Sequence, residues 1–118
     1  MKIYVDDIRN PENHLTAEQS EGIVWLKEWW EAKNFIFANS EEIEVLHFDN
    51  FLGDRTHTGA DLLMMVTHRL KRNAFPKLKQ IYLHSSDKDV VEKLYDGQIE
   101  RCTAAGVELI KNSRPNRT

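Results

Sequence analysis

The sequence predicts an α/β protein in which a five-stranded parallel sheet is the middle of three layers. Short apolar segments alternate along the chain with longer segments of helical periodicity, which is the pattern of strand–helix–strand units. The chain has 118 residues, 41% of them hydrophobic, and this suffices for one domain with one core. No repeat or linker divides the sequence, so we expect residues 1–118 to form a single domain.

The first part of the chain predicts two strands and one full helix. Residues 3–5 form a β-prone apolar run, and residues 23–26 form a second one. Residues 8–21 are polar and predict a loop with one helical turn near residues 16–20, so the helix of the first crossover is reduced. Parallel strands need a crossover of about a dozen residues, which this polar stretch supplies. Residues 28–38 carry apolar side chains on one helical face and predict a helix.

The second part predicts three strands and two helices. Residues 45–48 form an apolar strand, and residues 59–73 carry leucines at helical spacing with basic side chains in the last turn. A proline stops that helix. Residues 78–83 predict the fourth strand. Residues 88–105 predict a helix that ends before a glycine, and residues 107–110 predict the fifth strand.

Composition excludes several classes of function. The net charge is −3, which is unsuited to binding long double-stranded DNA because that needs a strong positive field. No apolar run approaches the ~20 residues of a membrane span, so we expect no membrane partner. Cys102 is the single cysteine, and the acids that follow the first apolar run are untypical of a signal peptide. We therefore expect a cytoplasmic protein.

Polar and charged side chains follow four of the five predicted strands. They are Asp6, Asp7 and Arg9 after the first strand, Asp49 after the third, His84 and Ser85 after the fourth, and Lys111 after the fifth. The carboxyl ends of parallel strands meet at one edge of a sheet, and ligands bind beyond that edge. We therefore expect these side chains to converge on one site.

The acids of this set predict a cation. Asp6, Asp7 and Asp49 would repel one another strongly at close range. A divalent cation removes that repulsion, and oxygen ligands of this kind suit Mg²⁺, which also binds phosphate oxygens. These three carboxylates are therefore the candidate ligands of Mg²⁺.

The remaining members of the set predict phosphate chemistry. Arg9 and Lys111 can neutralise the charge of a phosphoryl group. Ser85 can donate a hydrogen bond to that group, and His84 can transfer a proton near neutral pH. The sequence therefore predicts a phosphate site at this edge, with or without a metal ion.

Each signal also has a structural interpretation. Acids at strand ends form turns and caps, a strand-end histidine is often structural, and a lysine near a C-terminus is often solvated. Trp25, Trp29 and Trp30 fit core and surface cover better than a base-stacking platform. The basic stretch His68–Lys79 fits a helix end, or else meets RNA or an acidic partner. His57 is either exposed filler or a second acid–base group.

Four motifs occur in order along the chain. They are Asp6-Asp7-Ile8-Arg9-Asn10-Pro11, Asp49-Asn50-Phe51-Leu52-Gly53, Thr58-Gly59-Ala60-Asp61 and His84-Ser85. Together with Lys111 they resemble the cyclic-phosphate-processing receiver family, a divergent branch of the response-regulator receiver domains. The resemblance spans residues 2–110. It departs at Asn50 and Phe51, where the family has His and a second Asp.

The resemblance implies a receiver/flavodoxin-like fold and a hydrolase of the phosphodiesterase or phosphohydrolase kind. Its substrate would be a cyclic or terminal phosphate of a nucleotide or RNA end. The implied catalytic residues are Asp49, His84 and Ser85. The implied phosphate-binding residues are Arg9, Lys111, Thr58 and Gly59, and the implied metal ligands are Asp6, Asp7 and Asp49.

Two other functions stay open. One is a stand-alone receiver that is phosphorylated on Asp49. The other is a non-catalytic module that binds a nucleotide or a protein partner. The Phe51 substitution and the aromatic pair Trp29-Trp30 favour this interpretation.

Overall fold

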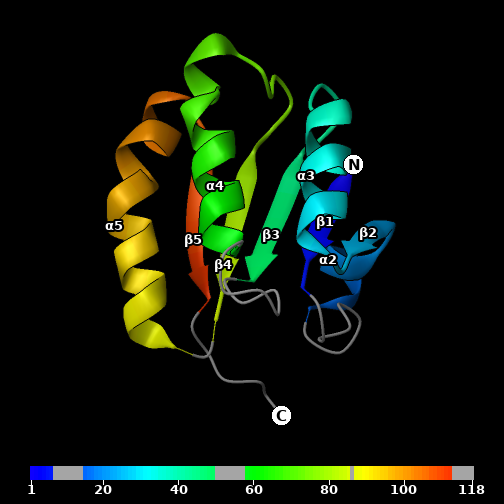
Figure 1. Cartoon of the computed structure of the whole chain (residues 1–118), viewed down its shortest axis with the longest axis horizontal. Helices are drawn as coiled ribbons and strands as arrows, with labels where there is room; N and C mark the ends of the chain where they lie inside the picture. The colour runs from blue at the N-terminus through cyan, green and yellow to red at the C-terminus, as the bar shows by residue number, and fades with distance from the viewer. Residues whose placement is uncertain (7–14, 50–57, 86, 113–118) are drawn as a thin grey trace.

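The structure is a computed structural model that describes residues 1–6, 15–49, 58–85 and 87–112. Strands and helices alternate along these residues (Figure 1). The elements are β1 (Lys2–Val5), α2 (Ala17–Ser20), β2 (Ile23–Leu26), α3 (Trp29–Ala38), β3 (Val45–Asp49), α4 (Gly59–His68), the 3₁₀ helix η1 (Leu70–Arg72), β4 (Gln80–His84), α5 (Lys88–Ala104) and β5 (Glu108–Asn112). No helix in these ranges is long and apolar enough to cross a membrane.

The strands form one five-stranded sheet in the order β2-β1-β3-β4-β5. Every neighbouring pair is parallel, as the sequence predicts. In the centre of the sheet Val5 pairs with Phe48, and Asp49 pairs with His84. The carboxyl ends of β1, β3 and β4 therefore lie side by side. The predicted receiver/flavodoxin-like arrangement is confirmed.

The helices are distributed unequally over the two faces of the sheet. Figure 1 shows α3, α4 and α5 on one face, with α4 beside α5. On the other face lies α2, which is the single helical turn expected near residues 16–20. Lys2 Nζ donates a hydrogen bond to the Glu18 carbonyl of this turn at 2.8 Å. Thr16 and Gln19 close a capping box that begins this turn. Among the described residues α2 alone forms the third layer, which fits the reduced first crossover.

Three predicted boundaries need correction. The helix expected over 59–73 ends at His68, and η1 follows before Asn73 turns the chain with φ 57°. The strands expected over 78–83 and 107–110 run over Gln80–His84 and Glu108–Asn112. Leu78 is buried in the core although its backbone precedes the strand, so its apolar side chain misled the prediction.

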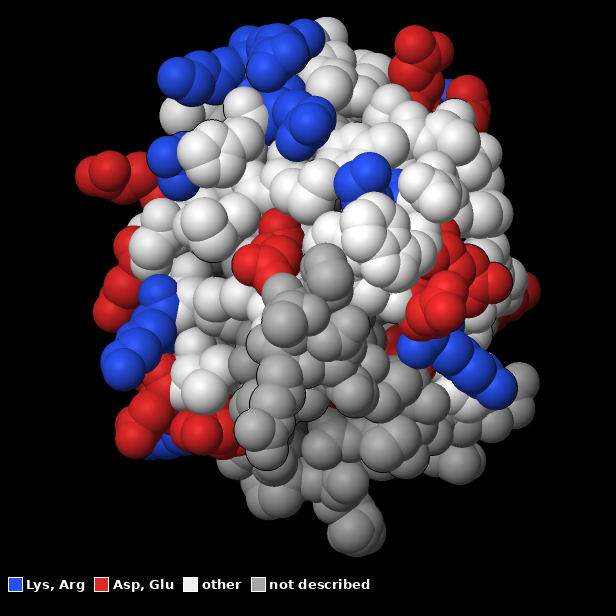
Figure 2. Space-filling model, in the orientation of Figure 1, with Lys and Arg blue, Asp and Glu red and all other residues white. Residues whose placement is uncertain are grey.

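The basic stretch His68–Lys79 begins where α4 ends. Arg69 donates from Nη1 to the Met65 carbonyl at 2.8 Å and so bonds a carbonyl in the last turn of the helix. Lys77 pairs with Glu42 at 3.1 Å. Figure 2 shows lysine and arginine side chains gathered at this end of the molecule. These contacts agree with the interpretation of the stretch as a helix end with solvated side chains.

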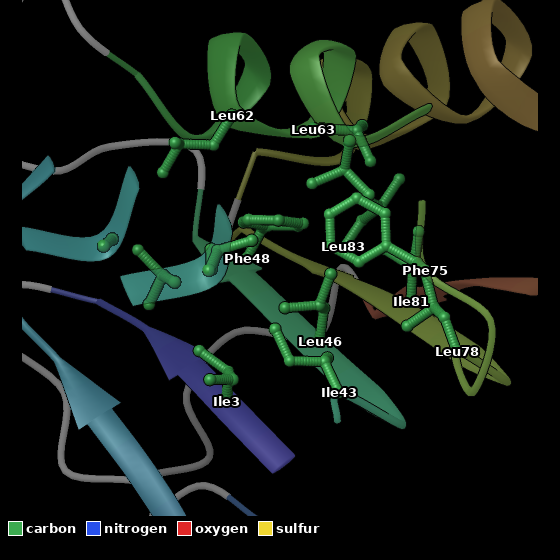
Figure 3. Packing of buried hydrophobic residues seen from close by; sticks show 14 of the residues in the cluster. Ile3, Ile43, Leu46, Phe48, Leu62, Leu63, Phe75, Leu78, Ile81 and Leu83 are labelled. Carbon is green, nitrogen blue, oxygen red and sulfur yellow. The ribbon is translucent and has the colours of Figure 1, made fainter. Parts of the chain in front are cut away.

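The hydrophobic core lies between the sheet and the three helices α3, α4 and α5. Alternate strand residues such as Leu46, Phe48 and Leu83 point into it, and Leu62 and Leu63 of α4 cover them (Figure 3). Burying one such side chain contributes about 1.5–3 kcal/mol. Because side chains alternate along a strand, the intervening residues of β1, β3 and β4 point to the face that carries α2.

Candidate functional site

Asp6, Asp49 and His84 form a row at the carboxyl edge of the sheet. Asp49 and His84 are register partners on β3 and β4. Asp6 follows Val5, whose partner Phe48 precedes Asp49, so Asp6 and Asp49 lie next to each other where β1 and β3 end. The side chains are buried, with 1%, 7% and 8% of the three residues exposed. The structure thus brings together two acids and an imidazole that the sequence placed on three separate strands.

Two hydrogen bonds from aromatic side chains fix Asp6. The Tyr4 hydroxyl donates to Oδ2 of Asp6 at 3.3 Å, and the Trp25 indole Nε1 donates to its backbone carbonyl at 2.7 Å. Sequence reasoning assigned Trp25 to the core and its surface cover and missed this role. The order of the strands in the sheet would have indicated this role, because β2 lies next to β1 and Trp25 pairs with Tyr4. Trp25 therefore helps to hold the first acid of the row.

His47 is a second residue that sequence reasoning missed. Its Nδ1 lies 2.8 Å from Nε2 of His84, which makes a buried hydrogen bond. The His47 ring also stacks on Tyr82, with centroids 4.4 Å apart and planes 9° from parallel. Burial, and to a lesser extent the electrostatic effects of His84 and Lys2, lower the pKa of His47 from the ordinary 6.5 to about 3. His47 is therefore neutral near pH 7.

The aromatic groups beside His84 form a cluster on the face of the sheet that carries α2. Tyr4 packs against both histidines, with centroid distances of 5.8 Å to His47 and 5.9 Å to His84. His47 and Tyr82 also line a groove of about 380 Å³ next to α2, toward the amino ends of the strands. The cluster thus extends from this groove to His84 at the carboxyl edge of the sheet.

Ser85 lies next to His84 and is 3% exposed. Its Oγ accepts a hydrogen bond from the Asp87 backbone N–H at 3.0 Å. Asp87 caps α5 by accepting from the N–H groups of Asp89 and Val90. The Ser85 hydroxyl can still donate while it accepts, so it keeps the donor function expected of it.

Thr58 and Gly59 form the start of α4. Thr58 Oγ1 accepts from the Asp61 N–H at 3.3 Å, and the Thr58 N–H donates to Asp61 Oδ2 at 3.0 Å. Trp29 Nε1 donates to the Thr58 carbonyl at 3.0 Å. The Thr58 hydroxyl is therefore used in a capping box. The N-terminus of α4 lies at the same edge as the strand carboxyl ends (Figure 1), and its partial positive charge favours an anion there.

Lys111 differs from its expected position. It lies within β5, opposite Leu83, rather than beyond the end of that strand. Its Nζ pairs with Glu92 of α5 at 3.1 Å and lies 4.5 Å from the centre of the Tyr95 ring. Lys111 therefore points to the face covered by α5, whereas His84, one register step further on β4, points to the other face. Its phosphate-binding role stays a prediction.

Part of the predicted metal site can be compared with the structure. Asp7, Arg9 and His57 lie outside the described residues. In the described ranges, no three His, Cys, Asp or Glu side chains are placed to hold a metal ion together. Mg²⁺ commonly takes only one or two protein carboxylates, with water and phosphate oxygens completing its shell. Asp6 and Asp49 meet that smaller requirement, and Mg²⁺ binding stays a prediction.

Trp29 lies in the core and Trp30 covers it from the surface, which agrees with the interpretation of the pair as core and surface cover. Trp29 is 7% exposed and belongs to the core. Trp30 is half-exposed and packs edge-on against Trp29, with centroids 4.8 Å apart. Lys33 Nζ lies 5.5 Å from the centre of the Trp30 ring.

Comparison with known proteins identifies the family of the chain. A search of curated proteins and a search of solved structures gave no match. A family model described as the cyclic-phosphate processing receiver domain matches residues 1–98. This range contains all four motifs, of which residues 7–11 and 50–53 fall outside the described part of the structure. The chain belongs to the family of cyclic-phosphate processing receiver domains.

Proposed function

We propose that this protein hydrolyses cyclic or terminal phosphates of nucleotides or RNA ends at the carboxyl edge of its sheet. The observation that carries the proposal is the row of Asp6, Asp49 and His84, which are brought together by the register of three neighbouring strands. The family, a receiver domain linked to cyclic-phosphate processing, supports the same class of substrate.

His84 is the proton-transfer group in this proposal. In hydrolysis of a cyclic phosphodiester, a water oxygen bonds to phosphorus and one ring P–O bond breaks. The His84 imidazole takes the proton from the attacking water and returns it to the leaving oxygen, so no net proton is gained or lost by the protein. Groups of this kind typically contribute about 10²–10⁴-fold to a rate.

The acids and the helix start have complementary roles. The N-terminus of α4 and the Ser85 hydroxyl favour the phosphate anion. Asp6 and Asp49 orient the attacking water. The same two carboxylates would hold Mg²⁺ when it binds, and the ion would supply positive charge against the phosphate oxygens. Arg9 and Lys111 are the basic side chains expected to neutralise the remaining charge.

Hydrolysis of cyclic phosphates tests this proposal directly. The substrates are 2′,3′- and 3′,5′-cyclic nucleotides and an RNA that ends in a 2′,3′-cyclic phosphate, each assayed with and without Mg²⁺. We expect His84→Ala and Asp49→Asn each to lower turnover about 100-fold or more. The control variant His68→Ala changes an exposed histidine at the other end of the molecule and should leave turnover unchanged. Unchanged turnover in both site variants would refute the proposal.

The same samples separate the two alternatives. A binding module would bind a cyclic nucleotide without converting it. A phosphoacceptor receiver would gain a base-labile phosphoryl mass on Asp49 when incubated with Mg²⁺ and a small phosphodonor, and Asp49→Asn would abolish that gain.

A further inference from the structure

His47 and His84 make a hydrogen bond that constrains the ring nitrogens of both side chains. Nδ1 of His47 lies 2.8 Å from Nε2 of His84, and His47 is 1% exposed. A hydrogen bond between two imidazoles needs an N–H on one nitrogen and a lone pair on the other. The pair can therefore exist in two arrangements, which differ in the nitrogen of His84 that carries the proton.

The chemistry of neutral imidazole selects between these arrangements. A neutral histidine side chain favours the tautomer with the proton on Nε2. If Nε2–H of His84 donates to the bare Nδ1 of His47, both rings hold this favoured tautomer. In the opposite arrangement both rings hold the less favoured one. The nitrogen pairing thus favours His84 as donor and leaves a lone pair on its Nδ1.

The packing around His47 holds its ring in the plane that this hydrogen bond requires. Tyr82 stacks on His47 with planes 9° apart, and the rings of His47 and His84 are also close to parallel, 19° apart. Tyr4 packs against both rings from β1. His47 therefore has little freedom to rotate its Nδ1 away from His84.

We propose that His47 is a positioning residue for His84: it accepts the Nε2–H hydrogen bond and so keeps His84 in the tautomer whose Nδ1 can take a proton. This inference rests on the proposed function of His84 as the proton-transfer group. The hydrogen bond persists when Nδ1 takes the proton, because Nε2 remains a donor, and it becomes charge-assisted at that moment. His47 thus stabilises the protonated form without touching the substrate.

The test combines a spectroscopic readout with kinetics. Nitrogen-15 NMR of the histidine rings reports which nitrogen of His84 carries the proton in the full chain. We compare the natural protein with His47→Phe, which keeps a stacked ring but lacks the acceptor, and with His47→Asn, whose amide oxygen can replace Nδ1. Tyr82→Phe keeps the stack and the acceptor and serves as the matched control.

In the expected spectrum of the natural protein, the Nε2 of His84 carries the proton and the Nδ1 carries none. In His47→Phe we expect a mixture of His84 tautomers and a kcat for cyclic-nucleotide hydrolysis about tenfold lower, with little change in KM, because one hydrogen bond is lost. His47→Asn should restore part of the kcat, and Tyr82→Phe should match the natural protein.

An Nε2 without a proton on His84 in the natural protein would overturn the inference, even if no variant folds. An unchanged His84 spectrum in His47→Phe would overturn it as well. If the natural protein proves inactive on every substrate, the proposed function fails while the spectra still decide the role of His47. A stability loss in His47→Phe with an unaltered His84 tautomer would show a merely structural role and would also overturn it.

Discussion

The indole Nε1 of Trp25 donates a 2.7 Å hydrogen bond to the backbone carbonyl of Asp6. This bond joins β2 to the first residue beyond β1, where the backbone N–H of Asp6 also bonds the Leu26 carbonyl at 3.1 Å. Both backbone groups of Asp6 are thus tied to β2. The position of the first acid in the row therefore depends on a tryptophan of the edge strand.

Trp25→Phe should destabilise the protein and weaken the site together. The substitution keeps an aromatic ring and leaves the Asp6 carbonyl without its donor, which costs about 1–3 kcal/mol in the free energy of unfolding. Urea denaturation measures this cost. The control Trp30→Phe changes a half-exposed side chain and should cost no more than about 0.5 kcal/mol. Equal unfolding midpoints for both variants would contradict the role of Trp25.

Thr58→Ala separates capping from phosphate binding. Loss of the capping box should lower the free energy of unfolding by about 1 kcal/mol. If Thr58 also holds phosphate, this variant should bind inorganic phosphate more weakly. Thr16→Ala removes the other capping box and is the matched control, which should leave phosphate affinity unchanged. Equal phosphate affinities in a titration calorimeter would restrict Thr58 to its capping role.

Glu92→Gln should strengthen phosphate binding if Lys111 reaches the anion. The substitution releases Lys111 from its ion pair, and the affinity for inorganic phosphate should rise severalfold. Glu42→Gln breaks the Lys77 pair and changes the net charge equally, so it controls for overall charge. The free energy of unfolding should change by less than about 1 kcal/mol in both. An equal change in phosphate affinity in the two variants would contradict a phosphate-binding role of Lys111.

The low pKa of His47 predicts a loss of stability in mild acid. The unfolded chain binds a proton at His47 near pH 6.5, whereas the folded protein does so only near pH 3, so the free energy of unfolding falls as the pH drops between these values. His47 alone accounts for a fall in the free energy of unfolding on the order of 3–5 kcal/mol between these two pH values. Urea denaturation at about pH 7 and about pH 4.5 should show a smaller loss for His47→Phe than for the natural protein. Equal losses would contradict the lowered pKa.

The parallel sheet was predictable because each strand is a short apolar run that ends at a polar residue. The same feature placed Asp49 and His84 at one edge, and in the structure they are register partners. The position of Lys111 did not follow. A strand continues as long as its neighbour offers hydrogen-bonding partners, and β4 extends to His84, so β5 continues to Asn112 and includes Lys111.

His47 and Trp25 show why the rest of the site escaped prediction. His47 lies inside an apolar run, and only the strand's place in the sheet reveals that its side chain shares a face with Tyr82 and His84. The contact of Trp25 with Asp6 depends on which strand lies beside β1. Local sequence patterns carry no information on such neighbours across a sheet.

Amide chemical-shift mapping with a nucleoside 2′,3′-cyclic phosphate tests the central claim most directly. The account predicts that the largest shift changes occur at Asp6, Asp49 and His84 and saturate at or below about 1 mM ligand. The paired residues Lys2, Val45 and Gln80 at the amino ends of the same strands should change little. Changes centred on that amino edge, or no changes at the carboxyl edge, would contradict the claim that this row of residues binds phosphate.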